Sequence, residues 1–348
     1  MASPKGFEPS THGLEGRCSI QLSYGDIYFL SINIIPFSFY FCKLYFIIFL
    51  IECIMIKKNK IIDICILFIC ILIFIISITN PLFFDNTINT LNIWLYNVFP
   101  PIFNFYIIIN LLLYFNVLDK LYFIFKPLTK LFRFDTNNAL HLFITSFLLG
   151  NPSSSCILLE SLNNNKISYN DYNRIMRSVS FPSLLFILNL YRDFKINIII
   201  LLSMILSSFF ICLLPIKNVK QYIPKNNNTQ QKNIMNIFLD AVKISLSIAS
   251  VMCFSSSIIF ALNYIKVPEI LTSILELCNG VFIIKKANLS FIIELAIITF
   301  LLSFNCFSIH LQIFANNNPI KYSSFLFYRI VAGVSSFFFS VIIYYLLY

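Results

Sequence analysis

The stretch that decides the fold is Ala139–Leu159, ALHLFITSFLLGNPSSSCILL, an apolar segment without Asp, Glu, Lys or Arg that is interrupted by Gly150-Asn151-Pro152. Pro152 has no N–H and clashes with the preceding turn, and Gly150 tolerates backbone angles that other residues avoid, so the helical hydrogen-bond ladder should open here. Ala139–Leu149 as a helix covers about 16 Å, whereas the hydrocarbon core of a membrane is roughly 30 Å thick. We therefore expect a re-entrant hairpin over residues 139–162.

A second stretch of the same kind is Leu295–Ala315, LAIITFLLSFNCFSIHLQIFA, which also lacks Asp, Glu, Lys and Arg and has polar residues around its middle. Its Phe300-Leu301-Leu302 matches Phe147-Leu148-Leu149 of the first stretch. We expect a second re-entrant hairpin over residues 289–315 and an internal repeat that relates the two. The identities are few and apolar residues also match by chance, so a chain without a repeat stays open.

The composition predicts an all-α polytopic membrane protein, because 58% of the 348 residues are hydrophobic and 11% are charged, with a mean hydropathy of +0.82. The net charge of +10 does not indicate a nucleic-acid partner, since the basic residues lie in short loops between apolar runs. The ten cysteines form no CxxC pair, so neither a disulfide framework nor a metal site is indicated. We expect no cofactor, and the lipid bilayer as the partner.

Residues 1–54 differ in composition from the rest of the chain. The first 25 residues hold four of the seven glycines and resemble the peptide obtained when a transfer-RNA gene is translated in frame. We therefore expect residues 1–54 to be a spurious extension, with Met55 as the genuine start. The alternative is that Ile27–Ile51 forms an additional helix. Both interpretations place Lys57 and Lys58 in the cytoplasm.

The first membrane half, residues 55–215, is predicted to begin with two crossings joined by an outer link. Ile61–Ile78 and Leu91–Phe115 are apolar enough to cross, and the link between them carries Asp85 but no Lys or Arg, which places it outside. Residues 118–135 have apolar residues at helical spacing opposite charged ones, a pattern that is typical of an amphipathic helix along the interface.

The rest of that half tests the first hairpin. A re-entrant segment at 139–162 keeps the basic residues of Asn163–Arg177 inside, as the positive-inside rule favours, whereas a full crossing would place them outside. Ser178–Tyr191, which contains Pro182, and Ile196–Leu214 then form a pair of crossings. A polar cytoplasmic linker, residues 216–233, ends this half.

The second membrane half, residues 234–348, repeats the order with the opposite orientation. Ile237–Tyr264 leads outward, which places a short helix, Val267–Asn279, and the second hairpin on the outer side. Ser323–Tyr348 returns inward. The predicted fold therefore has two inverted repeats, each with a spanning helix, an interfacial helix and a broken hairpin, an arrangement in which several transporter folds build a solute site.

The broken stretches offer the polar groups of a candidate substrate-binding site. Helix halves that end at a break expose unpaired N–H and C=O groups, which a polar solute can bind. Glu276 adds an acid in apolar surroundings, where ionisable groups are costly and often functional. The candidates are Gly150, Asn151, Pro152, Ser153, Ser154, Glu276, Asn305, Ser308, His310 and Gln312. The alternative is a packing kink whose Ser and Asn side chains satisfy one another.

No catalytic pattern is present. The sequence has no HExxH, no GxSxG and no phosphate loop. Ser153, Ser154 and His310 are the candidates for an intramembrane enzyme, but neither their spacing nor their surroundings favour one. We do not expect an enzyme.

Five segments carry a resemblance to a known family. Asn97–Phe105 is similar to its LFPPLLPF-like segment, Gly150-Asn151-Pro152 to its Gly-Tyr-Pro, and Ser180–Phe186 to its Ser-Gly-Pro-x-Phe region. Leu275–Gly280 is similar to its Leu-Glu-x-Thr-x-Gly, which adds Asn279 to the candidates, and Ser303–Gln312 to its SFGGxSVHxQ. Leu95–Tyr348 thus resembles the YlbJ family of sporulation integral membrane proteins, whose gate domain is shared with nucleoside transporters and iron-transport GTPases. Several family glycines are Asn, Ser or Cys here.

This resemblance implies a role in endospore formation, in making the spore cortex, within a cell membrane of a spore-forming bacterium such as the mother-cell or outer forespore membrane. The gate domain implies a carrier for a small polar solute, by analogy of fold. The alternative is a membrane scaffold in cortex assembly that transports nothing. A carrier should fail when Asn151 or Gln312 is replaced, whereas a scaffold should fail when the loop Lys217–Lys232 is altered.

Overall fold

The structure is a computed structural model that describes residues 60–115, 117, 132, 134–179, 181–214, 233–316 and 318–348. Residues from Ile64 to Tyr348 form one compact unit. The expectations for residues 1–54, for most of the amphipathic segment 118–135 and for nearly all of the linker 216–233 lie outside the described residues.

The described residues contain helices and no strand, which confirms the all-α class. In chain order the helices are α2 (Lys60–Thr79), α3 (Leu82–Ile93), a π-helical turn η1 (Trp94–Val98), α4 (Phe99–Tyr114), α6 (Asn137–Leu149), α7 (Ser153–Asn163), α8 (Tyr169–Ser178), α9 (Leu184–Leu188), α10 (Phe194–Leu213), α11 (Ile234–Tyr264), α12 (Glu269–Thr272), α13 (Leu277–Lys286), α14 (Phe291–Phe304), α15 (Cys306–Ala315) and α16 (Tyr322–Leu347).

Several of these helices are long and apolar enough to cross a membrane. Within the described ranges there are five such segments: Leu82–Tyr114, Phe194–Leu213, Ile234–Tyr264, Phe291–Ala315 and Tyr322–Leu347. On α16, Phe338 is 59% exposed and Ile342 is 53% exposed, as expected of side chains that face lipid. The chain is therefore a multi-pass α-helical membrane protein.

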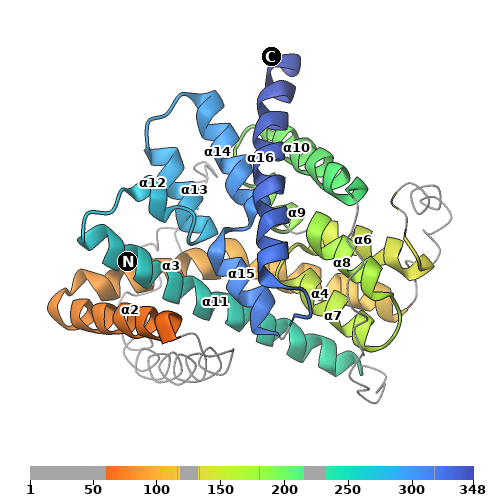
Figure 1. Ribbon diagram of the computed structural model, residues 1–348, viewed down its shortest axis with the longest axis horizontal. Helices are drawn as coiled ribbons and strands as arrows, with labels where there is room; N and C mark the ends of the chain where they lie inside the picture. The colour runs from red at the N-terminus through yellow and green to blue at the C-terminus, as the bar shows by residue number, and fades with distance from the viewer. Residues whose placement is uncertain are drawn as a thin grey trace, which may run out of the picture. The chain divides into compact units, whose positions relative to one another are not determined.

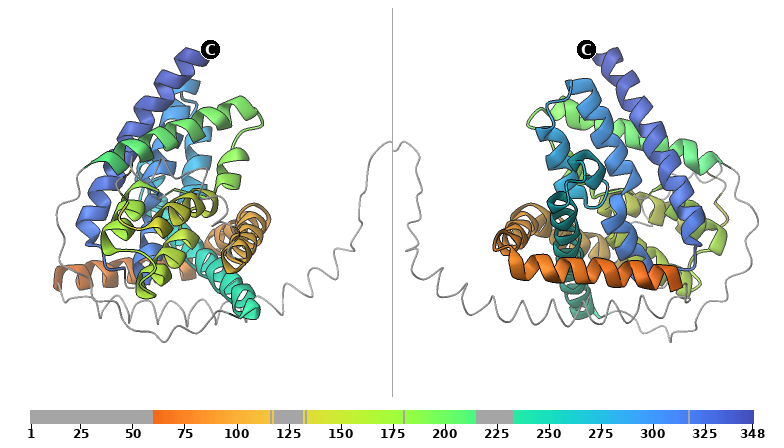
Figure 2. Two further views of the ribbon diagram at one scale, coloured as in Figure 1. Left: turned by 90° about the vertical axis from the view of Figure 1, so that its right-hand side faces the viewer. Right: turned by 60° about the vertical axis from the view of Figure 1, so that its left-hand side comes forward.

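α16 packs against both α14 and α10 (Figures 1 and 2). Small residues let these helices approach closely, as is common between membrane helices. Ser207 Oγ on α10 donates to the Ala332 carbonyl over 3.0 Å, and Ser336 Oγ on α16 donates to the Thr299 carbonyl over 3.3 Å. Gly333 lies against the ring of Phe300.

α11 packs against α3, α4 and α15. Asn86 Nδ2 and Thr90 Oγ1 on α3 both donate to Ser256 Oγ on α11, over 2.9 Å and 2.8 Å. α3, η1 and α4 run on as one helix of 33 residues, Leu82–Tyr114. Pro100 and Pro101 have no N–H to donate to the preceding turn, and that turn, η1, is π-helical. α3 begins at Leu82, so helix already forms within the segment that the sequence suggested as an outer link.

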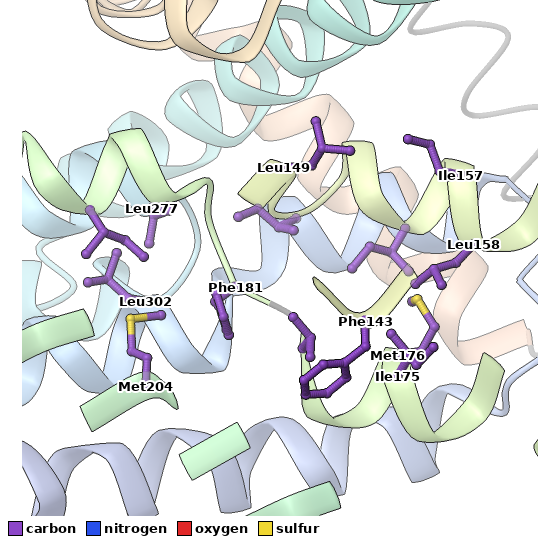
Figure 3. Close-up of a cluster of buried hydrophobic side chains, with 14 of the residues drawn as sticks. Phe143, Leu149, Ile157, Leu158, Ile175, Met176, Phe181, Met204, Leu277 and Leu302 are labelled. Atoms are coloured by element: carbon purple, nitrogen blue, oxygen red, sulfur yellow. The ribbon is translucent and has the colours of Figure 1, made fainter. Parts of the chain in front are cut away.

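One hydrophobic core joins the two halves of the chain. Figure 3 shows Phe181, from the segment between α8 and α9, lying between Phe143 of the first half and Leu277 and Leu302 of the second. All four side chains are at most 5% exposed. The places where helices are interrupted are therefore set in a common packed interior.

Two expectations about the helices require correction. The hairpin over residues 289–315 does not turn back: Asn305 and Cys306 have positive φ, but the Asn305 N–H still bonds the Leu301 carbonyl, and α15 continues in the direction of α14 (Figure 1). Phe291–Ala315 accordingly has the length of a full crossing. Ser178–Tyr191 is not a regular short span, because Ser183 is extended and α9 contains only five residues.

Candidate functional site

The first interruption is Gly150-Asn151-Pro152, between α6 and α7, which pack against each other as the two arms of a hairpin. Gly150 has φ 66° and ψ 173°, a region that only glycine readily adopts. The Asn151–Pro152 peptide bond is cis. The hairpin expected over residues 139–162 thus has its turn at the predicted glycine and proline.

The backbone of this turn lies directly on a second interruption, the segment 181–183 between α8 and α9. The Asn151 N–H donates to the Phe181 carbonyl over 2.8 Å. A Cβ added at Gly150 would overlap the backbone of Pro182 and Ser183, so glycine is required for close approach as well as for its dihedral angles. Inside the turn, Ser154 Oγ donates to Asn151 Oδ1 over 2.8 Å.

A third interruption separates α14 from α15 at Asn305, which has φ 75° and ψ 20°. Two cationic or polar side chains bind the carbonyl groups that this break exposes. His310 Nε2 pairs with the Phe304 carbonyl over 2.8 Å, and Arg329 Nη1 on α16 donates to the Ser303 carbonyl over 3.3 Å. Cations near a helix C-terminus are stabilising, because the last carbonyls carry partial negative charge.

The start of α15 lies against a fourth interruption, the segment 273–276 between α12 and α13. The N–H groups of Phe307 and Ser308 donate to the carbonyls of Ile274 and Leu275 over 3.0 Å and 2.8 Å. The sequence suggested a continuous short helix over Val267–Asn279, whereas the structure opens it at this point. α12 and α13 pack against each other, so the turning-back element of the second half lies here.

Glu276 is the last residue of this fourth interruption and caps the helix that follows it. Its side chain is 2% exposed and caps α13: Oε1 accepts from the Cys278 N–H over 3.1 Å and Oε2 from the Asn279 N–H over 2.7 Å. A carboxylate is a favourable cap because it accepts two otherwise unpaired N–H groups and lies at the positive end of the helix dipole.

Three of the four interruptions, together with the start of α15, line one cavity of about 50 Å³, which has room for a few water molecules. The first half contributes Asn151, Pro152, Pro182 and Ser183 to its lining. The second half contributes Glu276, Leu277, Cys278, Ser308, Ile309 and Gln312. Apolar side chains form the remaining wall: Val98, Pro101, Ile102, Phe186, Ile248 and Met252.

The candidate residues divide into three groups. Asn151, Pro152, Glu276, Ser308 and Gln312 line the cavity. Gly150, Asn305 and His310 shape the breaks without lining it, and Ser153, Ser154 and Asn279 belong to the first turns of α7 and α13. Gln312 is 5% exposed, and among the residues that the structure describes its Oε1 atom has no hydrogen-bond partner.

Sequence reasoning missed Arg329 and the apolar wall. Arg329 is 1% exposed at the break of α14. The signal was present, because Arg329 is the sole charged residue in the apolar run Tyr322–Leu347, and an ionisable residue inside a span is unusual. The sequence did not indicate that Met252 and Ile248 line the cavity, because the apolar residues of a spanning helix cannot be distinguished from one another before the packing is known.

Neither a metal site nor a relative is indicated. The described part of the chain contains no group of three or more His, Cys, Asp or Glu residues that could hold a metal ion. Comparison with protein-family models, with curated proteins and with solved structures found no match to the chain.

Proposed function

We propose that this chain is a membrane carrier that moves a small polar solute through the cavity between the two halves. The observation that supports it is the convergence of polar groups from both halves, Asn151 from one and Glu276, Ser308 and Gln312 from the other, on one buried space. Irregular backbone at membrane depth is tolerated where it lines a cavity, and carriers use such sites for binding.

The order of elements supports inverted repeats with a pairing different from the one the sequence suggested. In the first half a spanning segment, α4, is followed by α6–α7, by α8–α9 with its interruption, and by α10. In the second half α11 is followed by α12–α13, by α14–α15 with its interruption, and by α16. We propose that the repeat pairs these elements in this order.

For the biological setting, we propose endospore formation, in cortex assembly, within the mother-cell or outer forespore membrane. The resemblance of Gly150-Asn151-Pro152, Leu275–Gly280 and Ser303–Gln312 to the YlbJ family supports this setting. The cavity of about 50 Å³ holds only a few waters, so the two halves of the chain must separate at this point to admit a larger solute.

The test is uptake by the full chain in liposomes from a polar-metabolite extract of a sporulating bacterium, read by mass spectrometry. Accumulation of a solute by the native chain, its loss in Gln312→Leu and its retention in Asn138→Leu support the carrier. Asn138 is the matched control, because its side chain is exposed and bonds the Lys166 carbonyl away from the cavity. No accumulation by the folded native chain, together with normal spores from cells that carry Gln312→Leu, would favour the scaffold instead.

A further inference from the structure

The N-terminus of α13 is a position where many membrane carriers would offer free N–H groups to an anionic solute. In this chain a side chain of the protein already accepts those N–H groups. The Glu276 carboxylate, 2% exposed, accepts from the N–H groups of Cys278 and Asn279 and also lines the cavity. An anion that entered would meet a carboxylate where the helix would otherwise attract it.

Burial raises the pKa of the Glu276 carboxyl, whereas the N–H bonds from Asn279 and Cys278 favour its carboxylate form, and no cation of the described part of the chain accompanies it at the cavity wall. Among the described residues that line it there is no Lys, Arg or His. On α15 and α16, His310 and Arg329 are directed at the carbonyls of Phe304 and Ser303. Those contacts hold the break of α14, and neither residue lines the cavity. The lysines of α13, Lys285 and Lys286, lie in its last turn and do not line the cavity either.

Gln312 provides an independent observation that points to a ligand. Its side chain is 5% exposed and lines the cavity, and its Oε1 atom has no hydrogen-bond partner among the described residues. A buried acceptor without a partner is unfavourable, and a solute that donates a hydrogen bond would remove that cost. Gln312 and Glu276 thus both present acceptor oxygens to the same space.

We infer that the cavity binds a neutral or cationic solute that donates hydrogen bonds, such as an alcohol, an amide or an ammonium compound, and that it excludes carboxylates and phosphates. This inference rests on the proposed carrier function, whose site it describes. Glu276 attracts a cation or accepts from a hydroxyl, Gln312 Oε1 accepts a second hydrogen bond, and the apolar wall around Met252 contacts the carbon skeleton.

The test uses a cysteine in the cavity as a reporter of local charge. Ser308→Cys is close to isosteric and lies beside Glu276, because the Ser308 N–H bonds the Leu275 carbonyl. The full chain carries this cysteine alone, with its native cysteines replaced by alanine, because Cys306 lies in the same peptide and Cys278 lines the cavity. In lipid nanodiscs it is treated with methanethiosulfonates that carry either a trimethylammonium or a sulfonate group. Mass spectrometry of the peptide that contains residue 308 gives both rates, and each is divided by its rate with free 2-mercaptoethanol.

We expect the normalised rate of the cationic reagent to exceed that of the anionic reagent by about tenfold or more, since a unit charge a few ångströms away acts strongly in a buried site. Glu276→Gln should reduce this preference to near unity. Glu269→Gln should leave it unchanged, because Glu269 is exposed and does not line the cavity. Gln312→Glu should increase the preference for the cationic reagent. If Glu276→Gln does not fold, the rates measured with Gln312→Glu test the inference instead.

An equal or faster reaction of the anionic reagent would overturn the inference and leave the carrier in place. The same holds for a cationic preference that neither Glu276→Gln nor Gln312→Glu alters. Failure of both reagents to reach residue 308 in the folded protein would overturn the proposed function itself, because a carrier must open its cavity to water.

Discussion

The two halves of the molecule build their interruptions in different ways. In the first half the turn at Gly150 is held mainly by backbone, through dihedral angles that suit glycine, contact with Pro182 and Ser183, and a hydrogen bond to Phe181, with one side-chain bond inside the turn. In the second half side chains complete the structure, since Glu276 caps α13 and Arg329 and His310 bind the carbonyl end of α14.

The two halves therefore contribute different properties to the cavity: the first half determines its shape, and the second half determines its charge. The first half offers a rigid, neutral surface that should be sensitive to added volume. The second half holds the ionisable groups, and it should be sensitive to changes of hydrogen bonding and charge. The two sides of one cavity are therefore expected to respond to different substitutions.

The largest effect is expected for Gly150→Ala. The new Cβ overlaps the backbone at Pro182 and Ser183, and neither those atoms nor the dihedral angles at Gly150 can adjust cheaply. We expect a loss of more than about 3 kcal/mol, seen as failure to recover folded protein in detergent. Gly333→Ala is the control, because its Cβ meets only the ring of Phe300, a side chain that can move. Equal stability of the two variants would remove the claim that backbone contact holds the first half.

The next largest effect is expected for Glu276→Ala. It leaves the N–H groups of Cys278 and Asn279 buried without their acceptor, at a cost of about 2 kcal/mol. Glu276→Gln keeps one oxygen acceptor, so its loss should be about half as large. Denaturation in mixed micelles measures both, against Glu269→Ala as the exposed control. If Glu276→Ala and Glu269→Ala unfold at the same denaturant concentration, Glu276 does not hold the second half.

A smaller effect is expected for Ser154→Ala, which removes the bond from Ser154 Oγ to Asn151 Oδ1. One neutral hydrogen bond contributes about 1 kcal/mol, and the backbone of the turn remains in place. The same denaturation experiment should show this loss, while Ser250→Ala, on the exposed surface of α11, should change little. A loss as large as that of Gly150→Ala would mean that side chains, and not backbone, fix the first half.

The smallest effect on stability is expected for Gln312→Leu. Because Gln312 Oε1 is buried without a partner among the described residues, its replacement by an apolar side chain should leave the unfolding free energy unchanged or slightly raised. Thermal unfolding in micelles measures this directly. A clear loss of stability would show that Gln312 supports the fold of α15 and is not held for a ligand.

The sequence predicted the membrane class and two of the interruptions. Gly150 and Pro152 are visible within an apolar run because they oppose helix formation on their own. The polar residues around Asn305 are equally visible, but the direction of α15 is not, since a short break with positive φ can either reverse a helix or only bend it. Tertiary packing decides between these outcomes.

The two partner segments could not be predicted for the same reason. Ser273–Glu276 has the pattern of a short helix, and it opens because Phe307 and Ser308 supply N–H donors from a distant part of the chain. The segment 181–183 is not helical, and the Asn151 N–H bonds the Phe181 carbonyl there. Local propensity contains no information about these long-range bonds, so the meeting of the two halves at Glu276 became visible only in the structure.

The central claim is that the turn of the first half and the cap of the second half line the same cavity, and a cross-link tests it most directly. Asn151→Cys is combined with the native Cys278 in a chain whose other cysteines are replaced by alanine, and a bifunctional methanethiosulfonate with a short spacer is added. Both positions line the cavity, so mass spectrometry should find the two peptides bridged. When Cys278 is replaced by alanine and the exposed Lys266 by cysteine, no bridge should form. A bridge from residue 151 to residue 266 but none to residue 278 would contradict the account.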